Sequence, residues 1–355
     1  MARLVIGTSL TGVPTILPPD KYGISLEAWI GTPDAQGVVP AARGQGTPNF
    51  VGVTSVPEYW LYCRFENNTN LTGPVNFPDL VTLSNSYGLY CAFKGCTGLT
   101  EANFPNLTSI PGRDSLANTF ANCTNLVSFD LSNLVSVTGT YDGCQSTFAH
   151  CTSLVEADLG SLTTITGQYG CNSMFYDCPA LTTVNLGSLT TTDFDACAYM
   201  FKGCNHLTSV DLHSLTTISA TQVLMQTFSG CTRLTSLDLS SITTLSGTNS
   251  CLEMCLGCSR LASVDLSGLS TLTGSAALAN AFQNCSSLTT LSFPALTSTS
   301  FGSRTNQFNK MLKGVTGCTV HFPSNLQSII GAWSDITNGF DGTNTSVLFD
   351  LTATQ

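Results

Sequence analysis

The sequence predicts a solenoid, in which repeated, mainly β units stack around one continuous hydrophobic core and are joined by short helical or irregular turns. Three observations lead to this prediction. Eight cysteines recur at intervals of 26 to 28 residues, each with a Leu three positions later. After each of these leucines, apolar and polar residues alternate over a short stretch. This period of two residues is typical of a half-buried strand. One unit is too small to bury its own apolar edge, so neighbouring units must stack.

The repeat reads F-x-x-C-x-x-L-x-x-V-D-L-x-x-L-x-x-I. Its Cys position is occupied by Cys96, Cys123, Cys151, Cys178, Cys204, Cys231, Cys258 and Cys285. Its Phe position is occupied by Phe93, Phe120, Phe148, Phe175, Phe201, Phe228, Cys255 and Phe282. A second short strand is expected at segments such as 162–165 and 215–218, which read L-T-T-I. Each unit therefore has two short strands and a variable segment, and equivalent strands are expected to form a parallel sheet.

The ends of the chain differ from this pattern. Residues 1–50 are rich in Gly and Pro and do not fit the repeat. Residues 1–58 are interpreted as an N-terminal arm or docking element. The solenoid is expected over residues 59–330. Its first unit is degenerate, with Asn68 in place of the Cys, and its last unit keeps Val320 and Phe322 without a Cys. Residues 331–355 alternate turn-forming residues with short apolar runs, which predicts a C-terminal cap or hairpin.

The repeats resemble those of a known family. A-F-K-G-C-T-G-L-T-E at 92–101 and T-F-S-G-C-T-R-L-T-S-L-D-L at 227–239 look like BspA-type leucine-rich repeats, and the likeness extends over about residues 60–330. The resemblance implies a curved leucine-rich-repeat solenoid with a parallel sheet. It also implies a role in adhesion or protein binding, as in bacterial surface proteins.

Composition excludes several classes of partner. The net charge is −10, and only 10% of the residues are charged. Nucleic acid is not expected as a partner, because phosphate contacts need a basic patch and none is visible. No stretch approaches the roughly 18 apolar residues of a membrane span, so membrane insertion is not expected. The N-terminus is a poor match to a signal peptide. The expected location is nevertheless extracellular or on a virion surface.

The 16 cysteines invite a disulfide, redox or metal interpretation. Each repeat cysteine lies between an inward Phe and an inward Leu, where a small, weakly polar core residue fits, so buried free thiols are expected. Cys255 and Cys258 form a C-x-x-C whose spacing is inherited from the repeat. His150 and His206 have no matching His in other units and are interpreted as turn residues. Neither a metal site nor a cofactor is predicted.

Acidic side chains recur on the solvent side of the first strand, and stacking brings them into a row about 4.8 Å apart. We expect this row to be a candidate binding surface, made by Asp130, Asp158, Asp211, Asp238 and Asp265. Like charges stacked directly are unfavourable, so the row needs a cause. Three remain open: hydrogen bonding to adjacent Ser, Thr or water, a weakly held cation, and a glycan whose hydroxyls donate to the carboxylates.

The second strand also forms a row, with Thr163, Thr190, Thr216 and Thr243 in line. Its spacing resembles the threonine arrays of ice-binding solenoids. Those arrays lie on one flat face, whereas adjacent Thr-Thr pairs in this chain point in different directions, so ice binding is disfavoured.

The segments before each Phe vary most between units and shape one edge of the solenoid. Tyr141, Tyr169, Phe194 and Tyr199 are the candidate contact residues on this edge, since aromatic side chains supply much interface area at small entropic cost. Variation of this kind is also compatible with weak constraint. The edge is therefore a second candidate binding surface.

No catalytic motif is present: G-x-S-x-G, P-loop and H-E-x-x-H patterns are absent, and the four His are scattered. The chain is therefore predicted to be a non-enzymatic recognition or adhesion protein. The first hypothesis is a bacteriophage virion surface or host-attachment protein, because virions need no export signal. The alternatives are a bacterial cell-surface adhesin and an enzyme with a shallow acidic groove. Expected partners are a host surface protein or glycan, other virion or surface-structure subunits through residues 1–58, and further copies of the chain.

Overall fold

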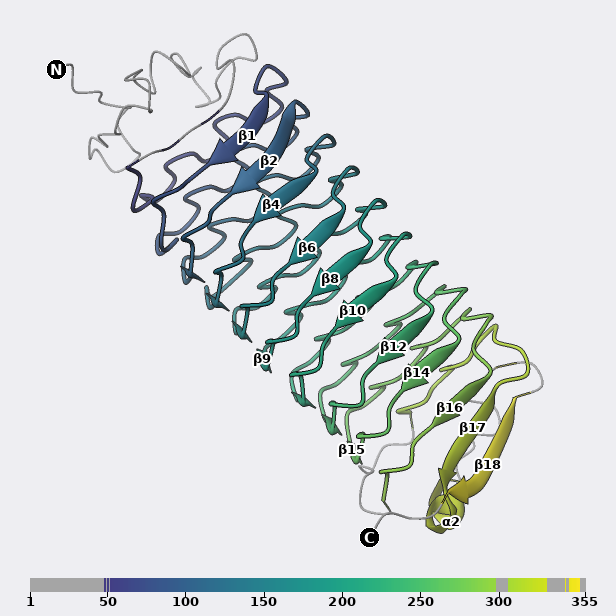
Figure 1. The fold of residues 1–355 in the computed structure, drawn as a ribbon. Helices are drawn as coiled ribbons and strands as arrows, with labels where there is room; N and C mark the ends of the chain where they lie inside the picture. The colour runs from purple at the N-terminus through teal and green to yellow at the C-terminus, as the bar shows by residue number, and fades with distance from the viewer. Residues whose placement is uncertain are drawn as a thin grey trace, which may run out of the picture.

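The computed structural model describes residues 48, 50, 52–297, 306–330, 342 and 345–351. The predicted N-terminal arm falls mostly on residues outside this set, as does much of the predicted C-terminal cap. The described chain forms a solenoid whose turns stack along one axis, with little bend in the view of Figure 1. This confirms the predicted fold class.

The first strand of each unit lies on one face of the stack (Figure 1), and the paired strands of this face run parallel to each other. In chain order these strands are β1 (Gly73–Asn76), β2 (Leu99–Asn103), β4 (Ser128–Asp130), β6 (Glu156–Asp158), β8 (Thr183–Asn185), β10 (Ser209–Asp211), β12 (Ser236–Asp238), β14 (Ser263–Asp265), β16 (Thr290–Ser292), β17 (Thr319–Pro323) and β18 (Ser346–Leu351). The register keeps equivalent residues side by side, so that Asp238 of β12 pairs with Asp265 of β14. Each motif position therefore becomes a column.

The second strands form a further parallel array at the next corner of each unit. They are β3 (Ser109–Ile110), β5 (Ser136–Val137), β7 (Thr164–Ile165), β9 (Thr191–Thr192), β11 (Thr217–Ile218), β13 (Thr244–Leu245) and β15 (Thr271–Leu272). Threonine hydroxyls in this array bond to the neighbouring unit: Thr190 Oγ1 donates to the Thr163 carbonyl at 3.2 Å, and Thr243 Oγ1 to that of Thr216 at 3.2 Å. These hydroxyl protons are engaged within the protein, which gives the row a structural role.

The variable segments are neither helix nor irregular loop. We call them the turn edge, and define it as residues 57–68, 86–96, 113–123, 141–151, 168–178, 194–204, 221–231, 248–258 and 275–285. In the unit at 168–178, alternate backbone N–H groups donate to carbonyls of the next unit, as from Cys171 to Ala196 at 2.9 Å. Others close four-residue turns, as from Met174 to the Cys171 carbonyl. The turn edge is thus a third hydrogen-bonded side of the solenoid.

The turns of this edge recur every four residues and hold their third residue at positive φ, as type II turns do. In one unit these residues are Tyr169, Ser173 and Asp177, with φ of 59°, 55° and 56°. The residue before each of the eight repeat cysteines has this conformation. In every case it is Gly, Asn, Asp or His. These types tolerate positive φ better than others, which explains the motif's recurring small or polar residue before Cys.

Stacked phenylalanines fill the core behind the turn edge. The rings of Phe93, Phe120, Phe148, Phe175, Phe201 and Phe228 are buried and lie in one column, with centroid separations of 5.4 to 5.9 Å and interplanar angles of 5° to 10°. Leucines of the strand segments pack against this column in one continuous core. Each unit contributes one layer and is completed by its neighbours.

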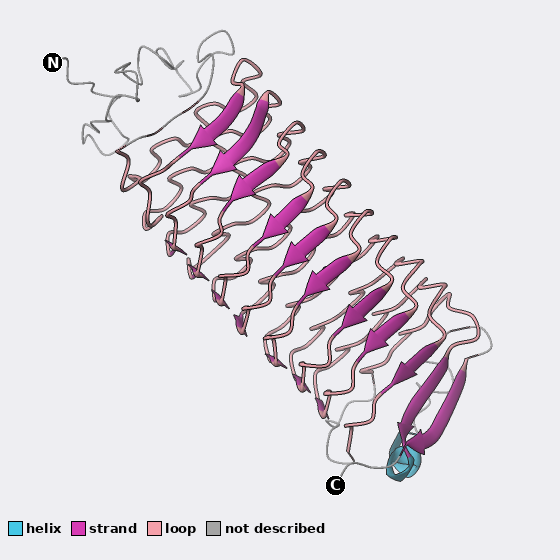
Figure 2. Cartoon of the chain, in the orientation of Figure 1, coloured by secondary structure: helices cyan, strands magenta, loops and turns pink. Residues whose placement is uncertain are grey.

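Helix is confined, within the described residues, to one short segment near the C-terminal end (Figure 2), made of η1 (Ser324–Leu326) and α2 (Gln327–Ile330). The last strand, β18, pairs in parallel with β17, bringing Thr319 beside Ser346. β18 therefore extends the solenoid sheet by one strand. The predicted domain boundaries themselves stay a prediction.

Candidate binding surfaces

The predicted acidic row lies on the strand face as expected from the register. We call it the acidic strand face and define it by Asp130, Asp158, Asp211, Asp238 and Asp265, with Asn185 occupying the intervening unit. Asp130 is half-buried and the four other aspartates are exposed. The apolar neighbours on either side of each Asp, such as Leu237 and Leu239, point into the core. The strand alternation therefore places every one of these carboxylates toward solvent.

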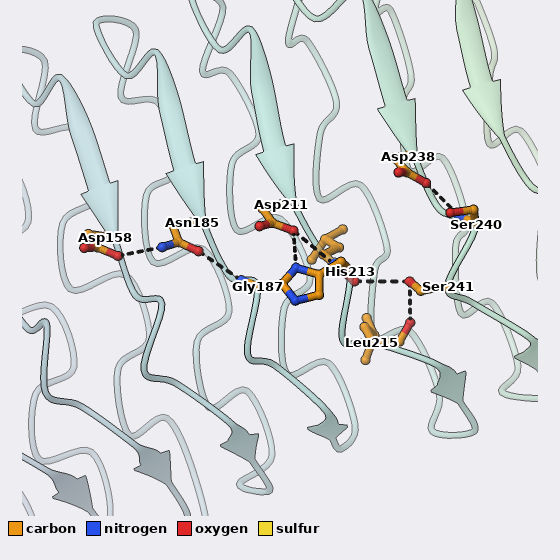
Figure 3. Close-up of polar contacts among 10 residues, drawn as sticks. Asp158, Asn185, Gly187, Asp211, His213, Leu215, Asp238, Ser240 and Ser241 are labelled. Carbon is orange, nitrogen blue, oxygen red and sulfur yellow. Dashed lines mark hydrogen bonds and ion pairs between the residues drawn. The ribbon is translucent and has the colours of Figure 1, made fainter.

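Each aspartate of this row caps a tight turn at the end of its strand. Asp238 Oδ1 accepts the backbone N–H of Ser240 at 2.9 Å (Figure 3). Asp265 Oδ1 accepts that of Ser267 at 2.8 Å. Asp130, Asp158 and Asp211 make the same bond to the N–H two residues on, at 3.0 to 3.1 Å. This is the Asx turn, which Asp and Asn favour because their short side chain reaches that N–H. The row thus has a structural cause in each unit.

Further hydrogen bonds to the aspartates come from neighbouring side chains. Asn185 Nδ2 donates to Asp158 Oδ1 at 3.0 Å, which joins adjacent units, and His213 Nδ1 lies 2.8 Å from Asp211 Oδ1 (Figure 3). Hydrogen bonds from the His213 side chain and backbone hold the pKa of Asp211 below its ordinary value. Bonds from the Ser240 side chain and backbone do the same for the pKa of Asp238. These carboxylates are stabilised in the charged form.

A shallow depression of about 430 Å³ lies on the strand face over β12 and β14. Its lining includes Asp238, Asp265, Ser263 and Ser292. Two carboxylates and several hydroxyls therefore converge at one place. The lining is a set of hydrogen-bond acceptors and donors suited to a hydroxyl-rich ligand. Among the described residues, no group of three or more His, Cys, Asp or Glu side chains is arranged to hold a metal ion.

The aromatic residues predicted for the turn edge do lie there, but not as one cluster. Tyr141 is exposed, and the Arg113 guanidinium lies 4.9 Å from its ring centroid. Tyr169 makes an edge-to-face contact with Phe194 at 5.8 Å. Tyr199 is half-buried, with Lys202 Nζ 5.3 Å from its ring centroid. The predicted residues therefore form three separate contact points along the edge.

Four tyrosines that the sequence analysis did not single out extend this surface. Tyr59 stacks on Tyr87 with centroids 5.0 Å apart, and Tyr62 stacks on Tyr90 at the same separation. Arg113 also lies 5.7 Å from the Tyr87 ring, between Tyr87 and Tyr141. We call Tyr59, Tyr62, Tyr87, Tyr90, Arg113 and Tyr141 the tyrosine cluster. Its four additional tyrosines could have been found from the sequence, because they occupy equivalent positions in two matching segments, E-Y-W-L-Y-C at 58–63 and S-Y-G-L-Y-C at 86–91.

Acidic groups lie beneath this edge as well. Asp114 is buried and accepts a bond from Arg113 Nε at 3.1 Å. Burial, together with the neighbouring carboxylate of Asp114, raises the pKa of Asp142 to about 6. Burial also raises the pKa of Asp195 to about 6. The pKa values of Asp142 and Asp195 are thus shifted in the opposite direction from those of Asp211 and Asp238.

All 16 cysteines lie within the described residues and are free thiols, and 15 of them are buried. In the repeat column each Sγ donates to a carbonyl of the preceding unit, as from Cys151 to Phe120 at 3.2 Å and from Cys178 to Phe148 at 3.1 Å. Burial raises the pKa of both thiols well above its ordinary value. The predicted core role of this column is therefore confirmed. Cys255 and Cys258 are buried among the same columns.

The histidines considered as metal ligands occupy separate places. His150 lies at a turn with φ of 60° and sits 3.6 Å from Asp177. His206 Nδ1 is 2.7 Å from Asn205 Oδ1. Both are half-buried: His150 lies on the turn edge, and His206 lies two residues after the turn-edge segment 194–204. Neither is placed with a second His or Cys that would complete a ligand set among the described residues.

Comparison with known proteins identifies the repeat. The model of the family described as BspA type leucine rich repeat region matches in six copies, over residues 62–197, 144–255 and 172–313. No curated protein matches the chain. No helix of the described residues is long and apolar enough to cross a membrane.

Three solved structures illustrate the similarity. A leucine rich repeat protein of T. pallidum is 21% identical, with 63% of this chain and 86% of that chain covered and a TM-score of 0.34. A leucine rich cell surface protein from Faecalibacterium prausnitzii is 15% identical, with coverages of 89% and 92% and a TM-score of 0.33. The pneumococcal vaccine antigen PcpA is 14% identical, with coverages of 92% and 84% and a TM-score of 0.39.

Proposed function

Because the chain belongs to the BspA-type leucine-rich-repeat family, we propose that it is a non-catalytic recognition protein that binds a partner at a cell surface. One observation carries the proposal. The core columns repeat from unit to unit, while the turn edge presents side chains that differ and includes exposed aromatic rings such as Tyr59, Tyr62 and Tyr141. Aromatic and Arg side chains are the commonest anchors of protein interfaces.

The finer proposal is that the chain is a host-attachment protein on a bacteriophage virion. The adhesin type of repeat supports contact with a host surface protein or glycan. Residues 1–58, most of which fit no repeat, supply a segment for docking to other virion subunits or to further copies of the chain. The alternative carrier is a bacterial cell, on which the same solenoid acts as an adhesin. Both carriers use the same binding surfaces.

Fractionation distinguishes the two carriers. Antibodies raised against the solenoid are applied to purified phage particles and to cell-wall fractions of the organism that encodes the chain. Detection in particles supports the virion proposal, and detection in the cell wall with none in particles supports the adhesin.

Binding measurements test the recognition surface. Labelled wild-type protein is compared with Tyr141→Ala and Tyr169→Ala on host cells and on a glycan array. We expect each variant to bind at least about fivefold more weakly, since loss of an interface anchor typically costs more than about 1 kcal/mol. Val135→Ala is the matched control, because Val135 is exposed to a similar degree, 44% against 42% for Tyr141, and lies outside the turn edge. Unchanged binding by both tyrosine variants would refute a role for this edge.

A further inference from the structure

Two cysteines are placed unlike the rest. Cys63 and Cys91 lie on the turn edge at the same position of adjacent units, four residues before Asn67 and Gly95. In later units this column holds Asn118, Ser146, Ser173, Tyr199, Gln226, Glu253 and Asn280, which are half-buried. Packing of the core therefore explains the repeat cysteines but does not explain this pair.

The backbone sets the pair side by side. The N–H of Cys63 donates to the Tyr90 carbonyl and that of Phe65 to the Ala92 carbonyl, both at 2.9 Å, so residue 63 lies next to residue 91. Neighbouring strands of this kind are about 4.8 Å apart, within the Cα separations of roughly 4.4 to 6.8 Å at which disulfides form. The φ angles of 49° and 51° direct both side chains alike. The two thiols are close enough for each to shift the pKa of the other, which raises that of Cys63 and lowers that of Cys91.

The surroundings favour reaction at this pair. Cys63 is the one cysteine of the chain that is not buried, and Cys91 behind it is 5% exposed. The hydrogen bond from the Cys63 thiol lowers the pKa of Cys91, and the nearby Lys94 ammonium acts in the same direction. Lys94 is held over these two units by an ion pair with Glu66 at 3.2 Å. The pair therefore gives up its first proton more easily than the buried thiols of the repeat column.

We propose that Cys63 and Cys91 are an oxidisable dithiol that closes to a disulfide by exchange with a low-molecular-weight disulfide of the glutathione class. Cys91 ionises first, and transfer of the Cys63 proton to the Cys91 thiolate moves the negative charge to the accessible Cys63. This thiolate attacks one sulfur of the reagent, the S–S bond of the reagent breaks, and one glutathione thiolate leaves. Cys91 then loses its proton to solvent and attacks the mixed disulfide at the Cys63 sulfur. The second glutathione leaves, so two protein thiols are oxidised and one reagent disulfide is reduced to two thiols.

The product crosslinks two adjacent turns of the solenoid. Each unit of such an array is held mainly by its neighbours, and a crosslink between two of them restricts their separation in the unfolded chain. Four tyrosines of the tyrosine cluster lie on the same two units, and Tyr62 stacks on Tyr90 directly beside the pair. The disulfide would therefore fix the spacing of these rings.

The test uses the full-length protein treated with glutathione disulfide at pH 8. The protein is then unfolded in iodoacetamide, so that every free thiol, buried ones included, is blocked. It is next reduced, and the thiols released by reduction are labelled with N-ethylmaleimide for peptide mass spectrometry. We expect a loss of two thiols per chain, with the second label at Cys63 and Cys91 together, and full reversal by dithiothreitol. Oxidation should also raise the Tm measured in the absence of reductant.

Cys144 and Cys171 provide the internal control, because backbone hydrogen bonds set them side by side in adjacent units as well, but both are buried. They should remain unlabelled. Cys91→Ser should leave a single glutathione adduct on Cys63, and Cys63→Ser should leave Cys91 unreacted. Serine occurs naturally in this column at Ser146 and Ser173, so both variants are expected to fold. A stable glutathione adduct on wild-type Cys63 without the crosslink, or equal labelling of Cys144 and Cys171, would overturn the proposal.

Discussion

At the scale of single residues, the aspartates of this chain lie in two different environments, and the residue type alone does not distinguish them. On the acidic strand face, Asp238 accepts hydrogen bonds from the backbone and side chain of Ser240, which hold its pKa below the ordinary value. Asp195 lies 6% exposed on the turn edge, and its Oδ1 lacks a hydrogen-bond partner. Burial without a partner penalises the charged form.

Replacing Asp195 with Asn should therefore stabilise the protein in a pH-dependent way. The pKa of Asp195 is about 6 in the folded chain, against about 3.9 in an unfolded one. Below pH 4 both states are protonated and the ionisation penalty is absent, whereas above pH 6 both are ionised and the penalty is complete. We expect Asp195→Asn to add about 1 to 2 kcal/mol to the unfolding free energy at pH 8 and little at pH 4.

Urea unfolding of both proteins at several pH values measures this difference. Asn also suits the φ of 52° at this position, because it adopts positive φ readily. That contribution does not depend on pH, so the rise between pH 4 and pH 8 isolates ionisation. A gain of equal size at both pH values would show that Asp195 ionises normally in the folded state.

At the scale of elements, the close approach of successive units limits which residues can end the second strand. Gly247 follows β13, and a Cβ there would overlap the backbone carbonyl of Ala220 in the preceding unit. The same contact recurs at Gly139, Gly167 and Gly274. Because the obstacle is backbone, relief requires the units to move apart locally.

Gly247→Ala is expected to lower the unfolding free energy by roughly 1 to 3 kcal/mol, the usual cost of overpacking. Gly257→Ala is the comparison: Gly257 has a φ of 75°, but no atom lies within 4 Å of its would-be Cβ, so only conformational strain of roughly 1 to 2 kcal/mol applies. The two costs can be similar in size, and hydrogen exchange separates them. Gly247→Ala should raise exchange in the two adjacent units, whereas Gly257→Ala should act within its own turn. Identical exchange patterns would contradict the proposed contact.

At the scale of the whole molecule, stability is distributed along a one-dimensional stack. Phe175 lies between Phe148 and Phe201, at 5.6 Å from each ring, and so connects the units on either side. Arrays of this kind behave as a sum of unit stabilities and nearest-neighbour interfaces. A cavity in the middle therefore weakens the coupling between the two halves of the solenoid.

Phe175→Ala should cost about 3 to 5 kcal/mol and split urea unfolding into two transitions, since the halves no longer unfold together. Phe65→Ala, made near the N-terminal end of the described stack, should lower stability while leaving one main transition. The number of unfolding transitions of each variant is measured by circular dichroism and hydrogen exchange at increasing urea concentration. One sharp transition for Phe175→Ala would show that coupling extends beyond nearest neighbours.

Sequence reasoning found the columns because they repeat. The periodic Cys, Phe and Leu residues predicted a stacked core, and the structure confirms that core and the exposure of most strand aspartates. The role of these aspartates and of the four predicted aromatic residues in binding stays a prediction. The tyrosine cluster was missed because Tyr59 and Tyr62 fall in the degenerate first unit, where the repeat pattern gives little guidance.

The sequence by itself determined the fold class, the parallel register and which residues point inward, because a period of 26 to 28 residues leaves stacking as the only way to bury each unit's apolar edge. Only the tertiary structure decided how neighbouring units touch. The Asx turns, the hydrogen-bonded turn edge, the contact of Cys63 with Cys91 and the unpartnered oxygen of Asp195 each depend on the few ångströms between adjacent units. Those distances are set by packing of the whole stack, which no single repeat encodes.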